Sequence, residues 1–184
     1  MIQSSPLAVA LCSAASFLLL PAPAQAQEVF AGAFAHGVNT PLTLDTGERG
    51  LDLELGYRFP RLTGVRLIGG PAPYVLASLN TKGETSFVGG GLAWKIGAGP
   101  AFVRPGIGLV VHTGPNFRIN PRSGLRSDLG SRVLFEPELG IGMHVAPRTT
   151  LEASWTHISH AKLFNAEQNP GIDMWGVRLG FAIH

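Results

Sequence analysis

The stretch from Leu51 to Phe59 reads Leu-Asp-Leu-Glu-Leu-Gly-Tyr-Arg-Phe, with an apolar side chain at every odd position and Asp, Glu, Gly or Arg at every even one. Successive side chains of a β-strand point to opposite faces of a sheet, so this order gives one apolar face and one polar face. An amphipathic helix would instead repeat its apolar residues every three to four positions. The stretch therefore predicts a strand between an apolar and a polar environment.

The same alternation continues along the chain. Residues 133–145 and 175–183 carry apolar side chains or proline at odd positions and mostly Glu, Gly, Arg or Ala at even ones. Less regular candidates complete a set of eight strands in one domain: 28–37, 72–80, 84–96, 100–112 and 149–160. The 24 glycines, 14 prolines and low content of charged residues also favour sheet and turns over helices.

The predicted connections fall into two length classes. Short connections are expected at 59–64, 97–99 and 146–148. Long ones are expected at 38–48, 113–129 and 161–172, with a tight exception at 80–83. Short turns on one rim and longer loops on the other are typical of outer-membrane barrels. We therefore predict an all-β fold, an eight-stranded antiparallel outer-membrane β-barrel.

Alternation alone also fits a soluble calyx such as a lipocalin, whose apolar side faces inward. The glycines and alanines of the polar face suit the crowded interior of a narrow barrel, where Arg132 is expected to pair with Glu136 and Glu138. The apolar face carries the aromatic residues of a lipid-facing band and its girdles: Tyr57, Trp94, Trp155, Trp175 and several Phe. These features favour the membrane barrel, although the chain ends in His184 rather than in an aromatic residue.

The first 26 residues are predicted to be a cleaved export signal, and residues 27–184 the barrel domain. An apolar run from Leu7 to Leu20 precedes a small-x-small pattern that ends at Ala26, although Met1–Pro6 lacks the usual basic residue. Cys12 lies inside this segment behind Leu11, where a lipoprotein would have a small residue. The mature chain therefore has no cysteine and no disulfide. An outer-membrane location in a Gram-negative envelope fits these features.

Charge excludes one class of partner. The sequence has 14 Lys and Arg against 12 Asp and Glu, without a basic run or a basic-aromatic stripe, so nucleic acid is not an expected partner. No segment after the signal approaches 18 uninterrupted apolar residues, as a transmembrane helix would need.

A hydroxyl, an imidazole and a carboxylate come together in the last predicted hairpin. His157 and Ser159 are two residues apart, so on a strand they share a face, with Cα atoms about 6.6 Å apart. Asp173 opens the run that contains Trp175 and has the same parity. If the two runs pair, all three side chains leave one face near its end. This is the arrangement of a serine hydrolase: nucleophile, general base and orienting carboxylate.

Parity places these three residues on the apolar, outward face, at the outer rim of the barrel. Lipid A is the lipid of that leaflet. A polar cluster in contact with lipid is costly unless it is hydrogen-bonded, which makes a structural role less favourable than a functional one. Each element alone has a plain structural explanation, since His-x-Ser pairs are common and Asn-Pro-Gly is first of all a turn.

This segment resembles the PagL family of lipid A deacylases, small eight-stranded outer-membrane barrels that remove the ester-linked acyl chain at the 3 position of lipid A. The family carries a His-x-Ser-Asn element at the end of the seventh strand and an acidic residue at the start of the eighth. The matching residues are His157-Ile-Ser159 and, after Asn169-Pro-Gly171, Asp173. The resemblance implies that Ser159 is the nucleophile, His157 the general base and Asp173 the orienting carboxylate. It implies no metal and no other cofactor.

Two residues depart from the family pattern. Asp173 stands where the family has Glu, one methylene longer. His160 stands where the family has an asparagine assigned to the oxyanion hole, and a neutral imidazole can still donate one N–H. Backbone N–H groups at 161–163 are further oxyanion candidates.

Three functions are compatible with the sequence. The first is a lipid A esterase, whose partners are lipopolysaccharide and outer-membrane lipids. The second is a non-catalytic barrel with a structural or adhesive role, and the third is a secreted lipid-binding calyx. A homodimer through the lipid face is possible in each barrel reading. Basic residues in the predicted outer loops are either solvated or meet lipid A phosphates: Arg118, Arg122, Arg126 and Lys162.

Overall fold

The computed structural model describes residues 27–41, 43, 46–115, 117–124, 126–163 and 170–183. The predicted signal segment 1–26 and His184 lie outside these residues. Within the described part of the chain, no helix is long and apolar enough to cross a membrane.

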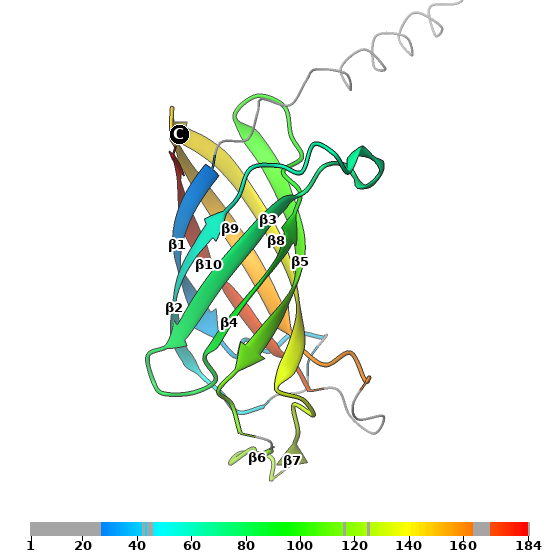
Figure 1. Ribbon diagram of the computed structural model, residues 1–184. Helices are drawn as coiled ribbons and strands as arrows, with labels where there is room; N and C mark the ends of the chain where they lie inside the picture. Colours follow the sequence, from blue (N-terminus) through cyan, green and yellow to red (C-terminus); the bar gives the residue numbers. More distant parts are fainter. Residues whose placement is uncertain are drawn as a thin grey trace, which may run out of the picture.

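Eight strands form a closed antiparallel barrel (Figure 1). They are β1 (Gln27–His36), β2 (Gly50–Arg58), β3 (Ala72–Asn80), β4 (Phe87–Ala93), β5 (Ala101–His112), β8 (Val133–Ala146), β9 (Thr149–Ile158) and β10 (Ile172–Ile183). Each strand pairs with the next in the chain, and β1 pairs with β10 to close the sheet. The predicted fold class and the eight predicted strands are confirmed.

Burial along β2 confirms that the apolar face points outward and the polar face into the lumen. Leu51, Leu53 and Leu55 are 45–61% exposed, whereas Asp52 and Glu54 are buried. Exposed apolar residues cover the outside of the other strands in the same way, among them Val88, Ile107, Ile141, Val177 and Leu179. So wide an apolar surface is far larger than a water-soluble monomer exposes, which rules out the calyx, whose apolar side faces inward.

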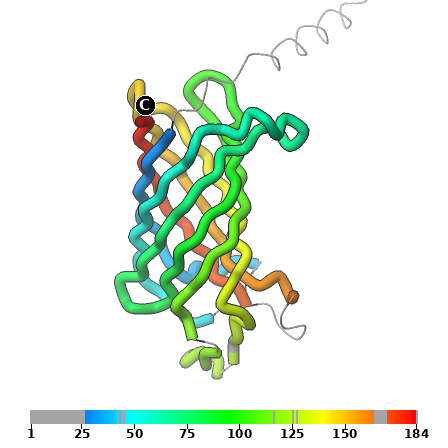
Figure 2. Tube along the Cα trace, in the orientation of Figure 1, coloured from blue at the N-terminus to red at the C-terminus, as the bar shows by residue number. Residues whose placement is uncertain are grey.

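The two rims differ as expected, with one exception. Figure 2 shows both ends of the described chain at one rim, with the β8–β9 turn, while β6 (Arg118–Ile119) and β7 (Arg126–Ser127) lie beyond the opposite rim. The β2–β3 connection is longer than the predicted 59–64. It runs through residues 59–71 and contains the 3-10 helix η2 (Arg66–Ile68). Trp94 binds this connection, since its Nε1 donates to the carbonyl of Ile68 at 2.6 Å.

Ion pairs fill the lumen. Arg178 is fully buried, and its Nε and Nη1 lie 2.5 and 2.6 Å from carboxylate oxygens of Glu54 and Glu138. Similar pairs join Arg58 to Glu28 and Arg104 to Glu152. The expected pairing of Arg132 with Glu136 and Glu138 is wrong: Arg132 donates to the carbonyls of His112 and Gly114, and Glu136 accepts from Tyr74. Arg132 precedes β8, so it reaches the loop carbonyls at the rim rather than the lumen.

Replacing Arg178 by methionine is expected to lower the free energy of unfolding by about 3–5 kcal/mol, because Glu54 and Glu138 would stay buried without their cation. Urea titration of the refolded barrel measures this. Arg126→Met is the matched control: its guanidinium is exposed and 4.0 Å from Asp128, so it should cost less than about 1 kcal/mol. Equal effects of the two changes would contradict a stabilising lumenal network.

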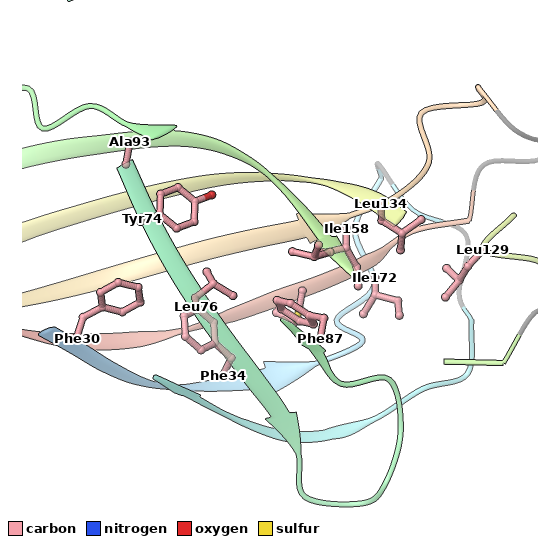
Figure 3. Close-up of a cluster of buried hydrophobic side chains, with 12 residues drawn as sticks. Phe30, Phe34, Tyr74, Leu76, Phe87, Ala93, Leu129, Leu134, Ile158 and Ile172 are labelled. Atoms are coloured by element: carbon pink, nitrogen blue, oxygen red, sulfur yellow. The ribbon is translucent and has the colours of Figure 1, made fainter. Parts of the chain in front are cut away.

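An apolar cluster extends along the inside of the barrel, and one end of it lies on the side of the long loops (Figure 3). Leu129 and Leu134 lie there beside Ile158 and Ile172, and both isoleucines are at most 1% exposed. Ile158 and Ile172 are directly paired across β9 and β10. The cluster therefore anchors from within the ends of the two strands whose outward residues form the predicted site.

Candidate active site

His157 and Asp173 are cross-strand partners on β9 and β10. The Nδ1 of His157 lies 2.9 Å from Oδ1 of Asp173, within hydrogen-bond distance. A carboxylate only accepts, so this contact requires the proton on Nδ1 and leaves Nε2 as the acceptor when the ring is neutral. The tautomer is the one that a general base acting through Nε2 needs.

Four side chains donate to the carboxylate of Asp173, which is 1% exposed. Trp155 Nε1 donates to Oδ1 at 2.9 Å, beside His157. Thr43 Oγ1 donates to Oδ2 at 3.1 Å, and Thr40 Oγ1 donates to the same oxygen. This full set of donors offsets the cost of holding a charged group under the loops of the rim.

Ser159 follows the last residue of β9 and keeps the outward parity of His157. Its backbone exchanges two hydrogen bonds with Phe135 of β8, with N–O distances of 2.8 and 3.1 Å, which fixes the strand end. Ser159 is 5% exposed, and among the described residues its hydroxyl donates to no other side chain, including His157. The structure thus brings His157 and Asp173 into contact and places Ser159 next to them on the same face without a closed Ser–His hydrogen bond.

His160 has the opposite parity to Ser159. Its ring is fully buried and packs against Gly130, where an ideal Cβ would lie 3.0 Å from Cδ2 of the ring. The chain then turns sharply, since Ala161 and Lys162 have φ values of 52° and 62° and the N–H of Leu163 donates to the carbonyl of His160 at 3.0 Å. The N–H of Leu163 is therefore already hydrogen-bonded within the turn, so Leu163 is no longer a candidate oxyanion donor.

Three contacts of the site were not predicted from the sequence. Thr40 and Thr43 come from the β1–β2 connection, 133 and 130 residues from Asp173. Trp155, expected as a girdle anchor, also stacks on His157 with ring centroids 6.0 Å apart. Its shared parity with His157 was the only available clue, because a strand brings every second side chain onto one face.

Gly171 is packed against the ring of His157. An ideal Cβ at Gly171 would lie 3.0 Å from Nε2 and would overlap Cε1. On the predicted role of His157 as general base, we expect Gly171→Ala to displace the imidazole and to lower kcat about 10- to 100-fold, because a general base misplaced by about 1 Å can cost that much. Gly64→Ala is the control, since a Cβ there meets nothing within 4 Å. Steady-state hydrolysis of a lipid ester measures both, and unchanged kcat in Gly171→Ala would contradict the close packing.

No group of three or more His, Cys, Asp or Glu side chains within the described ranges is arranged to hold a metal ion. Of the basic loop residues, Arg118 pairs with Glu84 and lies 3.5 Å from Glu48. Arg126 lies over the ring of Phe117, 4.6 Å from its centroid.

The family model for lipid A 3-O-deacylase (PagL) matches residues 55–182 of the chain. No curated protein matches the chain significantly.

Among solved structures, the outer membrane enzyme PagL is similar with 16% identity and a TM-score of 0.59, over 85% of this chain and 99% of that one. Neisserial surface protein A gives 13% identity and a TM-score of 0.55, over 88% and 100% of the two chains. The N-terminal barrel domain of Pseudomonas aeruginosa OprF gives 11% and 0.50, over 86% and 99%. The structural similarities concern the fold, and the family match covers both strands of the site.

Proposed function

Because the chain belongs to the lipid A 3-O-deacylase (PagL) family, we propose that it is an outer-membrane serine esterase that removes the ester-linked acyl chain at the 3 position of lipid A. The observation that carries the proposal is the hydrogen bond between His157 and Asp173, with Ser159 two residues further along the same outward face. The non-catalytic barrel is the alternative against which it is tested.

Ser159 is the proposed nucleophile and His157 the general base. Asp173 holds the proton on Nδ1, so Nε2 takes the hydroxyl proton as Oγ attacks the ester carbonyl. The resulting tetrahedral intermediate collapses when Nε2–H protonates the departing sugar oxygen, which leaves an acyl-Ser159 ester. Water, deprotonated by the same nitrogen, then releases the carboxylic acid and restores the serine.

The oxyanion of that intermediate needs donors on the outward side of the barrel. The N–H of Ala161 is the proposed backbone donor, because it follows Ser159 and His160 at the start of the turn whose Leu163 N–H is already used. His160 is the side-chain candidate by sequence, and it would have to leave its packing against Gly130 to donate.

The location of the three residues matches the proposed substrate. By strand parity they belong to the outward face, and the ends of β9 and β10 that carry them lie at the rim opposite the ends of the described chain. In an outer-membrane barrel whose short turns face the periplasm, this rim is at the outer leaflet, which is made of lipid A. A lipid A molecule beside the barrel would therefore lie at the level of Ser159, which supports lipid A as the proposed substrate.

Mass spectrometry of lipid A tests the proposal. Lipid A from cells that produce the protein is expected to lose the mass of one ester-linked acyl chain, and fragmentation should assign the loss to the 3 position. Cells with the empty vector supply the control. Unchanged lipid A, together with no fatty acid release from detergent-dispersed lipid A by the purified barrel, would support the non-catalytic alternative.

A further inference from the structure

Described residues of the β1–β2 connection, which runs between His36 and Gly50, contact the start of β10. β1 pairs with β10, so the connection leaves the sheet next to the strand that carries Asp173. The N–H of Val38 donates to the carbonyl of Asp173 at 2.9 Å, and Thr43 donates to its side chain at 3.1 Å. Thr40 donates to the same carboxylate oxygen as Thr43. The connection therefore contacts both the backbone and the side chain of Asp173.

The two threonines fix the rotation of the carboxylate. Oδ1 accepts hydrogen bonds from His157 and Trp155, and Oδ2 accepts hydrogen bonds from Thr40 and Thr43. A short aspartate side chain with donors on only one oxygen can turn about its last bond, and a buried Oδ2 without donors would favour such a turn. Donors on both oxygens hold the plane in which Oδ1 faces Nδ1 of His157.

A buried ionic cluster joins the two ends of this connection. His36, the last residue of β1, lies 2.7 Å through Nδ1 from Asp52 and 2.9 Å through Nε2 from Glu48. Carboxylates only accept, so a ring with both nitrogens engaged in this way fits an imidazolium. Glu48 also accepts from the N–H and the hydroxyl of Thr85, at 3.0 and 2.9 Å.

The carboxyl group of Glu48 stays ionised in its contact with His36. Burial alone would raise the pKa of its carboxyl, but the hydrogen bonds from His36 and Thr85, together with the charge of Arg118, outweigh burial and lower the pKa. Its charge is therefore retained at neutral pH. In the chain, His36 and Glu48 lie on either side of the residues that contact Asp173. Their contact therefore keeps the two ends of the connection next to each other. None of these cluster residues contacts His157 or Ser159 through a described hydrogen bond.

We propose that Thr40 and Thr43 are positioning residues for Asp173, and that the buried cluster of His36, Glu48 and Asp52 holds them in place. The inference rests on the proposed function, since it assigns the first extracellular connection to the active site of the esterase. The threonines act through Asp173 on the orientation of His157, and the cluster acts through the threonines.

Thr40→Val and Thr43→Val test the first part, since valine keeps the shape and removes the hydroxyl. Each change is expected to lower kcat about 10-fold with KM nearly unchanged, the effect of losing one hydrogen bond to a charged group. Thr40→Ser and Thr43→Ser should restore most of the rate. Thr113→Val is the control, because the side chain of this rim threonine bonds Ser86 and no other residue of the described ranges.

Purified barrels and detergent-dispersed lipid A serve for these measurements, with Ser159→Ala as the reference. Valine variants that match Thr113→Val in kcat, while hydrolysis still depends on Ser159, would overturn the positioning role and leave the proposed function intact. Equal rates of wild type and Ser159→Ala would instead overturn the proposed function.

A double-mutant cycle tests the second part. His36→Gln alone is expected to lower kcat about 10-fold, and to have little further effect in the Thr40→Val/Thr43→Val background, because the threonines carry its influence. Full additivity of the two effects would overturn the link. Glu48→Gln, which keeps the size of the side chain, repeats the cycle if His36→Gln does not refold.

Discussion

Replacing Ser159 by alanine is expected to lower the rate of lipid A deacylation by at least about 10⁴-fold, because loss of the nucleophile in a serine hydrolase costs up to about 10⁶-fold. The barrel should stay folded, since the backbone bonds of Ser159 with Phe135 do not involve the hydroxyl. Release of fatty acid from detergent-dispersed lipid A measures the rate. A residual rate from binding and the oxyanion donors is compatible with the mechanism.

Ser154→Ala is the matched control for this change. Ser154 lies on β9, which Ser159 directly follows, and is also buried, but it faces the lumen and its hydroxyl donates to Glu152. Its loss should leave deacylation within about 2-fold of wild type, since it removes one hydrogen bond far from the outward face. Wild-type activity in Ser159→Ala would exclude this residue as nucleophile.

Asp173→Asn is expected to have the second largest effect, a loss of about 10⁴-fold in kcat with little change in shape. An amide that faces Nδ1 with its NH₂ group donates instead of accepting, so the imidazole proton moves to Nε2, which can then no longer take the proton of Ser159. The positive charge that develops on His157 in the transition state would also lose its counter-charge. Single-turnover measurements of acyl release report this step directly.

Glu84→Gln controls for the loss of one negative charge at the same rim. Glu84 pairs with Arg118 and makes no described contact with the three proposed catalytic residues. Its replacement should leave kcat unchanged. If Asp173→Asn behaved like Glu84→Gln, the hydrogen bond between His157 and Asp173 would be structural, and the proposed mechanism would need another orienting group.

The alternation of apolar and polar residues in the sequence was sufficient to predict the barrel. The alternation from Leu51 to Phe59 predicts both the strand and its two environments, because strand geometry repeats every two residues and lipid accepts only apolar side chains. The same rule placed His157, Ser159 and Asp173 on one face, since the relevant hairpin joins segments that are neighbours in the chain. The catalytic assignment rested on this shared face together with the resemblance to the family, and it stays a prediction until it is tested.

Only the tertiary structure decided the contacts that depend on closure of the barrel. Thr40 reaches Asp173 because β1 pairs with β10, and a pairing across 133 residues leaves no periodic trace in the sequence. The lumenal partners of Arg178 and the loop contacts of Arg132 were unpredictable for the same reason. A repeat of two residues specifies which face a side chain occupies, whereas its partner on that face is set by strand stagger and loop path, which are properties of the closed sheet.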